Sequence, residues 1–518
     1  MTTRRPRPTP IARSAFADYR FPPEVIVVAV RWNLRFGLQS YRDVEELLAE
    51  RGVEVFGTQT LSARLMSSTL GCSRLNARLH EPRRSLCAVR GVHRTGEGEV
   101  PMSTSDTLAF NPFLPEVHED PYPLYRRLRA EDPVHRSALG FWVLTRHADV
   151  LAVLRDPRMS RDPRRSERLE LLRSSTEVDD LLASEEAAPS MLFVDPPDHT
   201  RLRALVNKAF TPGAVERLRP RVEAIVAGLL DRVVGAGVMD VVEDVAYPLP
   251  VTVVCELFGV PEADRDRFRA WSRELVRLLD PLVAADALER ALQARLGLRG
   301  YLRGLIAERR AYPTGDLLTA LVAAEDQGHQ LSEAELVSMC VLLLVAGHET
   351  TVNLIANGTL ALLRHPEARA SLQADSALAG SAVEELLRYD SPVQFTSRHA
   401  LADLDIGGCR VRVGESVVAV LGAANRDPAQ FPDPDRLDLA RAPNRHVAFG
   451  GGIHSCLGAP LARTEARIAI SALLARLPGL ELGPQPPVRR DTVTLRGLAS
   501  LPVTFPVPSG RDAVRSDG

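Results

Sequence analysis

The longest apolar stretch of the chain, residues 331–363, predicts a single long helix. Ser332 and Glu335 form a capping-box pattern at its start, and the pair His365–Pro366 predicts its end. About thirty helical residues span roughly 45 Å, which is enough to cross a domain.

Other hydrophobic patterns predict more helices and few strands. Runs rich in Ala, Leu, Arg and Glu, such as 214–234 and 288–310, are typical of helices. Residues 141–144 predict a short strand, and 404–420 predict a hairpin that turns at Gly407–Gly408. The sequence therefore predicts a mainly α fold, with a large helical domain and a small β-rich lobe.

Residues 449–458 place Cys456 in a glycine-rich loop, ahead of a helix-like stretch at 459–463. Glycines allow positive φ and the close approach of a large planar ligand. A thiolate at a helix N-terminus is stabilised by the helix dipole and by N–H groups, and it suits haem iron. The alternatives are a buried structural thiol and a zinc site shared with His454. Zinc is disfavoured because no Cys-x-x-Cys or His-x-x-x-His partner stands nearby.

The long predicted helix contains Ala-Gly-His-Glu-Thr-Thr at 346–351, near its middle. A glycine there costs about 1 kcal/mol relative to alanine. A buried glutamate costs more unless it is paired or hydrated. The alternative is an exposed stretch of an amphipathic helix, but apolar residues on all sides of the preceding run argue against it.

Two shorter patterns are weak on their own. Glu385 and Arg388 are three residues apart and share a helix face, as many exposed ion pairs do. His199 and Arg203 are four apart in a stretch that follows Pro196–Pro197, where a helix can begin. The alternative for the second pattern is an ordinary basic helix face.

The pattern Phe449-x-x-Gly-x-x-x-Cys456-x-Gly458 resembles the haem-ligand loop of the cytochrome P450 family. The other three segments resemble further motifs of that family, in the right order, and the resemblance covers about residues 111–508. It implies the cytochrome P450 fold and a haem b cofactor, with the Cys456 thiolate as the metal ligand. Phe449 would pack beside the sulfur, and Gly450 would belong to the same cofactor-binding loop.

The same resemblance assigns roles at the long helix. Ala346 and Gly347 would form the groove that admits dioxygen beside the haem. Thr350 would donate a hydrogen bond to dioxygen, and Glu349 would relay protons through water. Both roles would require a wet pocket.

Further residues are assigned by the resemblance alone. The residues expected at the haem propionates are His199, Arg203, Arg398 and His454. Glu385 and Arg388 would form the family's buried ion pair, with Arg436 as its third member.

These motifs predict a haem-thiolate monooxygenase that inserts one oxygen atom from dioxygen into a hydrophobic small molecule, a secondary metabolite such as a polyketide. A peroxide-driven peroxygenase is the alternative, but such enzymes usually lack the pair formed by Glu349 and Thr350. No flavin or iron–sulfur motif follows the cysteine loop, so we expect a separate ferredoxin and its reductase to supply electrons.

Composition narrows the cellular setting. The formal net charge of −2 gives no reason to expect nucleic-acid binding by the haem domain. Lys208 is the one lysine among 64 basic residues, which suggests a high-GC bacterial genome. No run of eighteen apolar residues occurs, so we expect no membrane span. We also expect a cytoplasmic, monomeric enzyme with no membrane attachment. The six scattered cysteines predict no disulfides.

Residues 1–101 precede the part of the sequence that resembles the cytochrome P450 family. Residues 20–55 resemble the N-terminal fragment of insertion-sequence transposases, and the Ser, Arg and Gly-rich sequence after Phe56 is typical of disorder. This segment alone would favour a DNA-binding, transposase-related protein. We expect instead a partly disordered remnant, with translation beginning at Met102 and a haem domain over 102–518.

Overall fold

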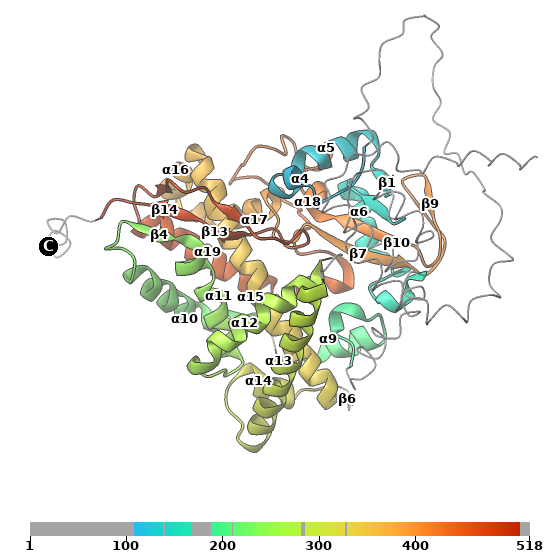
Figure 1. Ribbon diagram of the computed structural model, residues 1–518, viewed down its shortest axis with the longest axis horizontal. Coiled ribbons are helices and arrows are strands. Elements are labelled where there is room, and N and C mark those ends of the chain that lie inside the picture. Colours follow the sequence, from blue (N-terminus) through green and yellow to red (C-terminus); the bar gives the residue numbers. More distant parts are fainter. Residues whose placement is uncertain are drawn as a thin grey trace, which may run out of the picture. The chain divides into compact units, whose positions relative to one another are not determined.

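The structure is a computed structural model, and it describes residues 108–137, 140–167, 188–209, 211–280, 285–326 and 329–507. The expectations for residues 1–101 fall outside these described ranges. Figure 1 shows many helices and several small sheets, which confirms the predicted mainly α fold with its small β-rich part.

The α-helices are, in chain order, α4 (Pro115–Glu119), α5 (Tyr122–Glu131), α6 (His147–Arg155), α9 (Asp198–Ala209), α10 (Pro212–Asp231), α11 (Pro248–Leu257), α12 (Arg265–Val276), α13 (Ala285–Ala311), α14 (Leu317–Val322), α15 (Glu333–Arg364), α16 (Pro366–Ala374), α17 (Ala379–Tyr389), α18 (Leu421–Ala424) and α19 (Ala459–Arg476). The strands are β1 (Val134–Arg136), β2 (Trp142–Leu144), β3 (Met159–Ser160), β4 (Val238–Asp240), β5 (Glu325–Asp326), β6 (His329–Gln330), β7 (Phe395–Ala400), β8 (Leu404–Ile406), β9 (Cys409–Val411), β10 (Ser416–Val420), β11 (Glu481–Leu482), β12 (Val488–Arg489), β13 (Leu498–Ser500) and β14 (Pro502–Thr504).

Helix α15 is the long helix that the apolar pattern predicts. Its capping box is complete, because the Ser332 side chain accepts from the Glu335 N–H and the Glu335 side chain accepts from the Ser332 N–H. It ends at Arg364, where His365 and the proline that follows stop it. By length and composition α15 could cross a membrane, but 61% of its apolar window is buried inside the protein, as in the core helix of a soluble protein.

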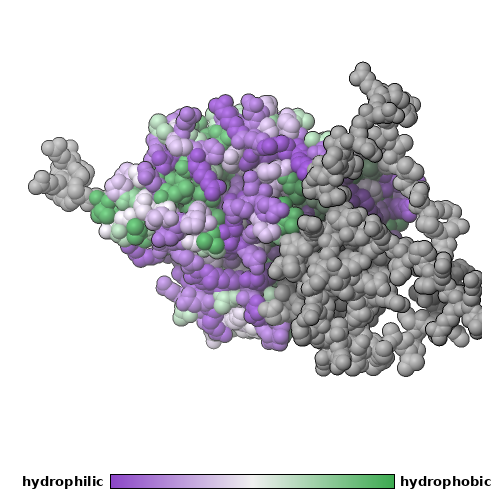
Figure 2. Space-filling view, turned by 45° about the horizontal axis from the view of Figure 1, so that its top comes forward, coloured by the Kyte–Doolittle hydropathy of each residue, from purple (hydrophilic) through white to green (hydrophobic). Residues whose placement is uncertain are grey.

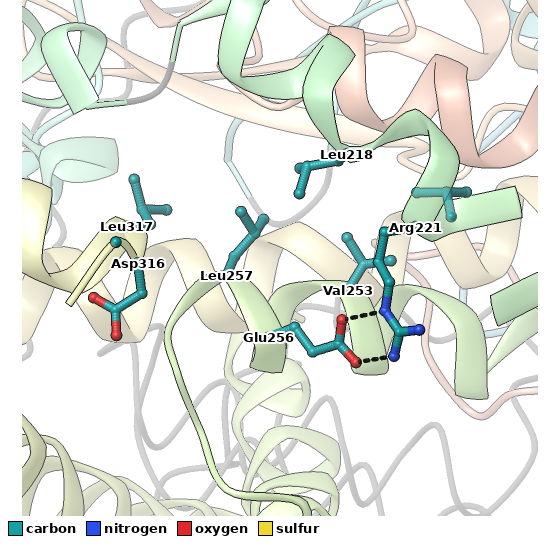
Figure 3. Close-up of a pocket in the computed structure, with 9 residues that line it drawn as sticks. Leu218, Arg221, Val253, Glu256, Leu257, Asp316 and Leu317 are labelled. Carbon is teal, nitrogen blue, oxygen red and sulfur yellow. Dashed lines mark hydrogen bonds and ion pairs between the residues drawn. The ribbon is translucent and has the colours of Figure 1, made fainter. Parts of the chain in front are cut away.

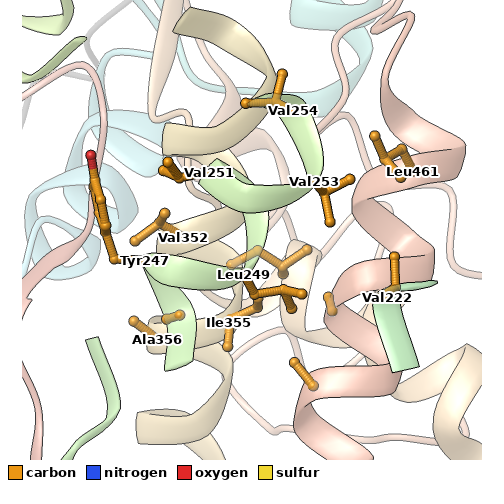
Figure 4. Close-up of a cluster of buried hydrophobic side chains, with 14 of the residues drawn as sticks. Val222, Tyr247, Leu249, Val251, Val253, Val254, Val352, Ile355, Ala356 and Leu461 are labelled. Atoms are coloured by element: carbon orange, nitrogen blue, oxygen red, sulfur yellow. The ribbon is translucent and has the colours of Figure 1, made fainter. Parts of the chain in front are cut away.

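The main hydrophobic core forms where α15 packs on α11 and α19. Figure 4 shows side chains of α11, among them Leu249 and Val253, lying close to Ile355 of α15. Leu461 of α19 and Val222 of α10 belong to the same buried cluster. Burying each such side chain contributes about 1.5–3 kcal/mol, so this packing fixes α15 relative to the cysteine loop that precedes α19.

The β-rich lobe contains a five-stranded sheet in the order β1-β2-β10-β7-β3. The predicted strand at 141–144 is β2, which pairs with β10 in parallel and with β1 antiparallel. The predicted hairpin is β8–β9, and Gly407 and Gly408 turn it with φ of 59° and 85°. Two successive positive φ angles are those of a type I′ turn, which explains the glycine pair. Figure 2 shows that the described surface visible from one side is largely hydrophilic.

Candidate active site

The cysteine loop has a backbone path that requires glycine. Gly450 and Gly452 have φ of 70° and 68°. A Cβ atom on Gly452 would lie 2.3 Å from the carbonyl oxygen of Leu154, so no larger residue fits without moving backbone. The Cys456 N–H donates to the Phe449 carbonyl at 3.0 Å, which closes the loop.

The Cys456 sulfur lies at the N-terminus of α19. Burial raises the pKa of Cys456, while the N–H groups of Gly458 and Ala459 and the charges of Arg203 and Arg463 act to lower it. The side chain is nevertheless exposed. The Cys456 side chain is therefore accessible although protein surrounds it, as expected for a side chain that faces an internal space.

Two other described cysteines lack these features. Cys255 and Cys340 are buried free thiols, and burial raises the pKa of each to about 12. The structural-thiol alternative therefore fits those two and not Cys456. Within the described ranges no group of three or more His, Cys, Asp and Glu side chains could hold a metal ion, so nothing there supports the zinc alternative.

Glu384 holds the loop and the start of α19 together. It accepts from Arg463 at 2.6 and 2.9 Å and lies 3.1 Å from Nε2 of His446. Burial raises the pKa of Glu384, but His446 and Arg463 outweigh it and lower the pKa to about 2. Arg463 also stacks on the Phe449 ring at 4.5 Å. Sequence reasoning missed this clamp because its members are 62 and 79 residues apart.

The four residues predicted at the propionates are brought together. The rings of His199 and His454 lie 4.2 Å apart, and Nε2 of each ring is buried without a hydrogen-bond partner. Burial, and then the charges of His199, Arg398, Arg161 and Arg203, lower the pKa of His454 to about 3. The charge of Asp195 acts on His199 and Arg398, but in the described part of the chain no carboxylate forms an ion pair with any of the four. Basic groups gathered in this way indicate a site for an anion. The two carboxylates of haem b fit this donor set.

The middle of α15 is open on one side. Ala346 is exposed and Thr350 half-buried, although both belong to a largely buried helix. The Thr350 hydroxyl donates to the Ala346 carbonyl at 3.2 Å. The predicted groove residues therefore line an accessible face of α15, as a ligand-facing helix requires.

Glu349 does not share that face, because its carboxylate is buried and lies on another side of α15. Its side chain is 1% exposed and pairs with Nη1 of Arg490 at 2.5 Å. His348 lies 3.5 Å from the other carboxylate oxygen, Oε1, which has no hydrogen-bond partner. Burial raises the pKa of Glu349, but His348 and Arg490 outweigh it and lower the pKa to about 2. Arg490 is the permanent cation of the two, because a histidine is charged only when protonated.

A polar face of α15 explains this orientation. Glu349, Asn353 and Asn357 are spaced by four residues and so lie on one side of the helix. Asn357 donates to the Arg496 carbonyl at 3.0 Å and accepts from Arg489 at 3.2 Å. This face therefore packs on the β12–β13 hairpin rather than on the groove.

Replacing Arg490 with glutamine should destabilise the protein by about 3 kcal/mol at pH 7, because it leaves a buried carboxylate unpaired. The folded pKa of Glu349, about 2, lies below its ordinary value of about 4.3. The pair therefore stabilises the fold above about pH 4, and this contribution is lost as the pH falls toward 2. Urea unfolding at pH 7 and pH 3 should show the variant approaching the wild type at the lower pH. Arg310→Gln, which breaks an exposed pair with Glu333, should cost under about 1 kcal/mol.

The predicted buried ion pair is present, with a different third member. Arg388 donates to Glu385 at 2.7 and 2.8 Å, and both side chains are fully buried. Arg441 completes the group, with Nε 3.2 Å from Glu385. The assignment of Arg436 is wrong, because this residue contributes only its carbonyl oxygen, which accepts from Arg388 at 3.1 Å.

A surface hollow lies away from these residues. Figure 3 shows it between α10, α11 and α14, with the Arg221–Glu256 ion pair on one side. Its volume is about 270 Å³, and none of the predicted site residues lines it. We assign it no role in the chemistry.

Comparisons with known proteins agree with this geometry. A family model described as cytochrome P450 matches residues 182–491. Cytochrome P450 107B1 of Saccharopolyspora erythraea is 46% identical over 78% of this chain and 98% of its own length. Cytochrome P450 monooxygenase PikC of Streptomyces venezuelae is 46% identical over 77% of this chain and 94% of its own.

Solved structures give the same result. The structure of P450BioI in complex with an acyl carrier protein ligated to hexadec-9Z-enoic acid has a TM-score of 0.70 and 41% identity, over 76% of this chain and 99% of that one. The bacillaene polyketide synthase cytochrome P450 PksS of Bacillus subtilis has a TM-score of 0.69 and the same identity. Cytochrome P450 enzymes are haem-thiolate monooxygenases that use dioxygen and redox partners to oxidise hydrophobic molecules, and this chain belongs to their family.

Proposed function

We propose that residues 102–518 form a haem domain that binds haem b with the Cys456 thiolate as axial ligand and oxidises a polyketide or a similar secondary metabolite. One observation carries the proposal. His199, Arg203, Arg398 and His454 lie in electrostatic range of one another, and Nε2 of both histidines is buried without a hydrogen-bond partner. Arg203 also acts on the Cys456 sulfur. A flat dianion with a central metal would satisfy both sets of groups at once.

The binding residues have separate tasks. Cys456 supplies the thiolate, and the N–H groups of Gly458 and Ala459 stabilise its charge. Phe449 and Gly450 shape the loop, with the Phe449 carbonyl accepting from the Cys456 N–H and Gly450 at a positive φ. The propionates would be held by His199, Arg203, Arg398 and His454, because charge-assisted hydrogen bonds to carboxylates are strong.

The catalytic residues act on protons. The bound haem supplies the activation of dioxygen, for which two electrons and two protons are needed. Ala346 and Gly347 leave room on the accessible face of α15, where the Thr350 hydroxyl can orient a proton donor. We assign proton delivery to Glu349 through its unpartnered oxygen Oε1, which can accept a hydrogen bond from a water molecule.

Replacing Thr350 with alanine should preserve haem and substrate binding but lower the product formed per electron pair by about tenfold or more. The hydroxyl that orients proton delivery is lost, so reduced oxygen escapes as peroxide. Thr350→Ser should restore most of the coupling. Thr351→Ala is the matched control, because that hydroxyl belongs to a buried residue of the same helix and donates to the Gly347 carbonyl at 3.5 Å. Equal coupling in Thr350→Ala and wild type would remove Thr350 from the mechanism.

The relatives support the substrate class. PksS is named for polyketide biosynthesis, and another relative, 43% identical, is a mycinamicin IV hydroxylase/epoxidase. We propose a ferredoxin and its reductase as the electron donors, in the cytoplasm of a bacterium. A screen of polyketide macrolactones for a spin-state shift would identify a substrate. Turnover under labelled dioxygen should then add one heavy oxygen atom to the product, and a product without label would contradict monooxygenation.

A further inference from the structure

Arg161, which the sequence patterns do not single out, lies beside one of the predicted propionate residues. It follows β3, and its Nη1 donates to the carbonyl oxygen of Ser397 at 3.0 Å and to the Ser397 hydroxyl at 3.1 Å. Nη1 of Arg398 donates to the same carbonyl oxygen at 2.8 Å. Two guanidinium groups therefore meet at one neutral acceptor.

Among the described residues, neither guanidinium of this pair forms a direct ion pair, although the charge of Asp195 acts on Arg398. In the described part of the chain, no carboxylate lies within ion-pair distance of the Arg161 or Arg398 guanidinium. Asp195 is close, but it accepts from the Ser160 hydroxyl and from the backbone N–H of Arg161. Burial, and then the charge of Arg398, lower the pKa of Arg161 to about 9. Two neighbouring cations in a buried place are costly unless an anion joins them.

The position of Arg161 points to the same anion as the two histidines. Arg161 and Arg398 both act on the pKa of His454, so both side chains lie in electrostatic range of its imidazole. The Arg161 guanidinium also lies over the Phe193 ring, with Cζ 5.3 Å from the ring centroid, a contact that helps to hold it in place. A guanidinium held this way can bind a carboxylate through two N–H groups.

We propose that Arg161 is an additional anchor for a haem propionate, acting with Arg398 across the Ser397 carbonyl. The inference rests on the proposed haem site. Such an anchor would also connect β3 and Phe193 to the cofactor. Arg161 directly follows β3, and its side chain contacts the Phe193 ring and Ser397 of β7. A purely structural arginine at this position would need only its hydrogen bonds to Ser397.

The test separates charge from hydrogen bonding. Arg161→Gln keeps an N–H donor for Ser397 but loses the charge, whereas Arg161→Lys keeps the charge and loses the planar fork. Transfer of haem from the purified ferric holoenzyme to excess apomyoglobin gives the rate of haem loss. We expect Arg161→Gln to lose haem about tenfold faster than the wild type, with Arg161→Lys between them.

Arg164→Gln is the matched control, because Arg164 is exposed and pairs with Asp162 at 2.7 Å. It should lose haem at the wild-type rate. The propionate bending band in the resonance Raman spectrum should shift in both Arg161 variants and not in the control, which keeps the test decisive if Arg161→Gln folds poorly. A wild-type rate and an unshifted band in haem-loaded Arg161 variants would overturn the role of Arg161 alone. A wild-type protein that binds no haem would instead overturn the proposed function.

Discussion

Replacing Cys456 with serine should abolish both the thiolate spectrum and the monooxygenase activity. Serine has nearly the same size, so the loop and its glycines can keep their geometry. Its hydroxyl is far less acidic than a thiol and is a poor ligand for haem iron at neutral pH. The N–H groups of Gly458 and Ala459 would then face a neutral oxygen instead of a thiolate.

The measurement is the absorption spectrum of the reduced protein under carbon monoxide, together with product formation. Cys409→Ser is the control, since Cys409 is another partly exposed cysteine, in strand β9 of the hairpin. It should keep the wild-type spectrum and activity. A Cys456→Ser protein with an unchanged spectrum and turnover would disprove the assignment of Cys456 as the ligand.

Replacing Arg388 with alanine should cost about 3–5 kcal/mol and release haem together with the folded state. Arg388 is fully buried and donates to Glu385 and to the carbonyl oxygens of Asn425, Pro434 and Arg436. Its removal takes this donor from the carbonyl oxygens of Asn425 and Pro434, and it takes the bidentate partner from the buried Glu385 carboxylate, which keeps Arg441. Total stabilities are only about 5–15 kcal/mol, so the loss is a large share.

Urea unfolding and haem content per protein measure the two effects. Arg410→Ala removes an exposed arginine that pairs with Asp403 at 2.6 Å, so it should cost under about 1 kcal/mol and leave haem content unchanged. Equal unfolding free energies for Arg388→Ala and Arg410→Ala would show that the buried network does not hold the fold.

The elements with strong local signals were predictable from the sequence. The capping box and terminal proline define α15, and the glycine pair defines the β8–β9 turn. The glycine-dependent path of the cysteine loop was predictable because it depends on short-range spacing. These signals act within a few residues, where the chain's own geometry fixes the outcome.

The features that the sequence did not predict have a common physical cause. Adjacent residues of a helix point in directions that differ by about 100°. The sequence therefore did not show which of the neighbours Glu349 and Thr350 faces the accessible side of α15. Arg441 and Arg436 are five residues apart in an irregular segment, and only its three-dimensional path brings Arg441 to Glu385. Arg161 belongs to no sequence motif. Its proposed role depends on its hydrogen bond to Ser397, which is 236 residues away in the sequence.

The central claim is that this chain holds haem through the Cys456 thiolate. The most direct test is the carbon monoxide difference spectrum of the reduced wild-type protein. Thiolate ligation predicts a Soret band displaced to the long wavelength typical of haem-thiolate enzymes, in proportion to the haem bound. A band at the shorter wavelength typical of imidazole ligation in freshly purified protein, or a folded protein without haem, would contradict the claim.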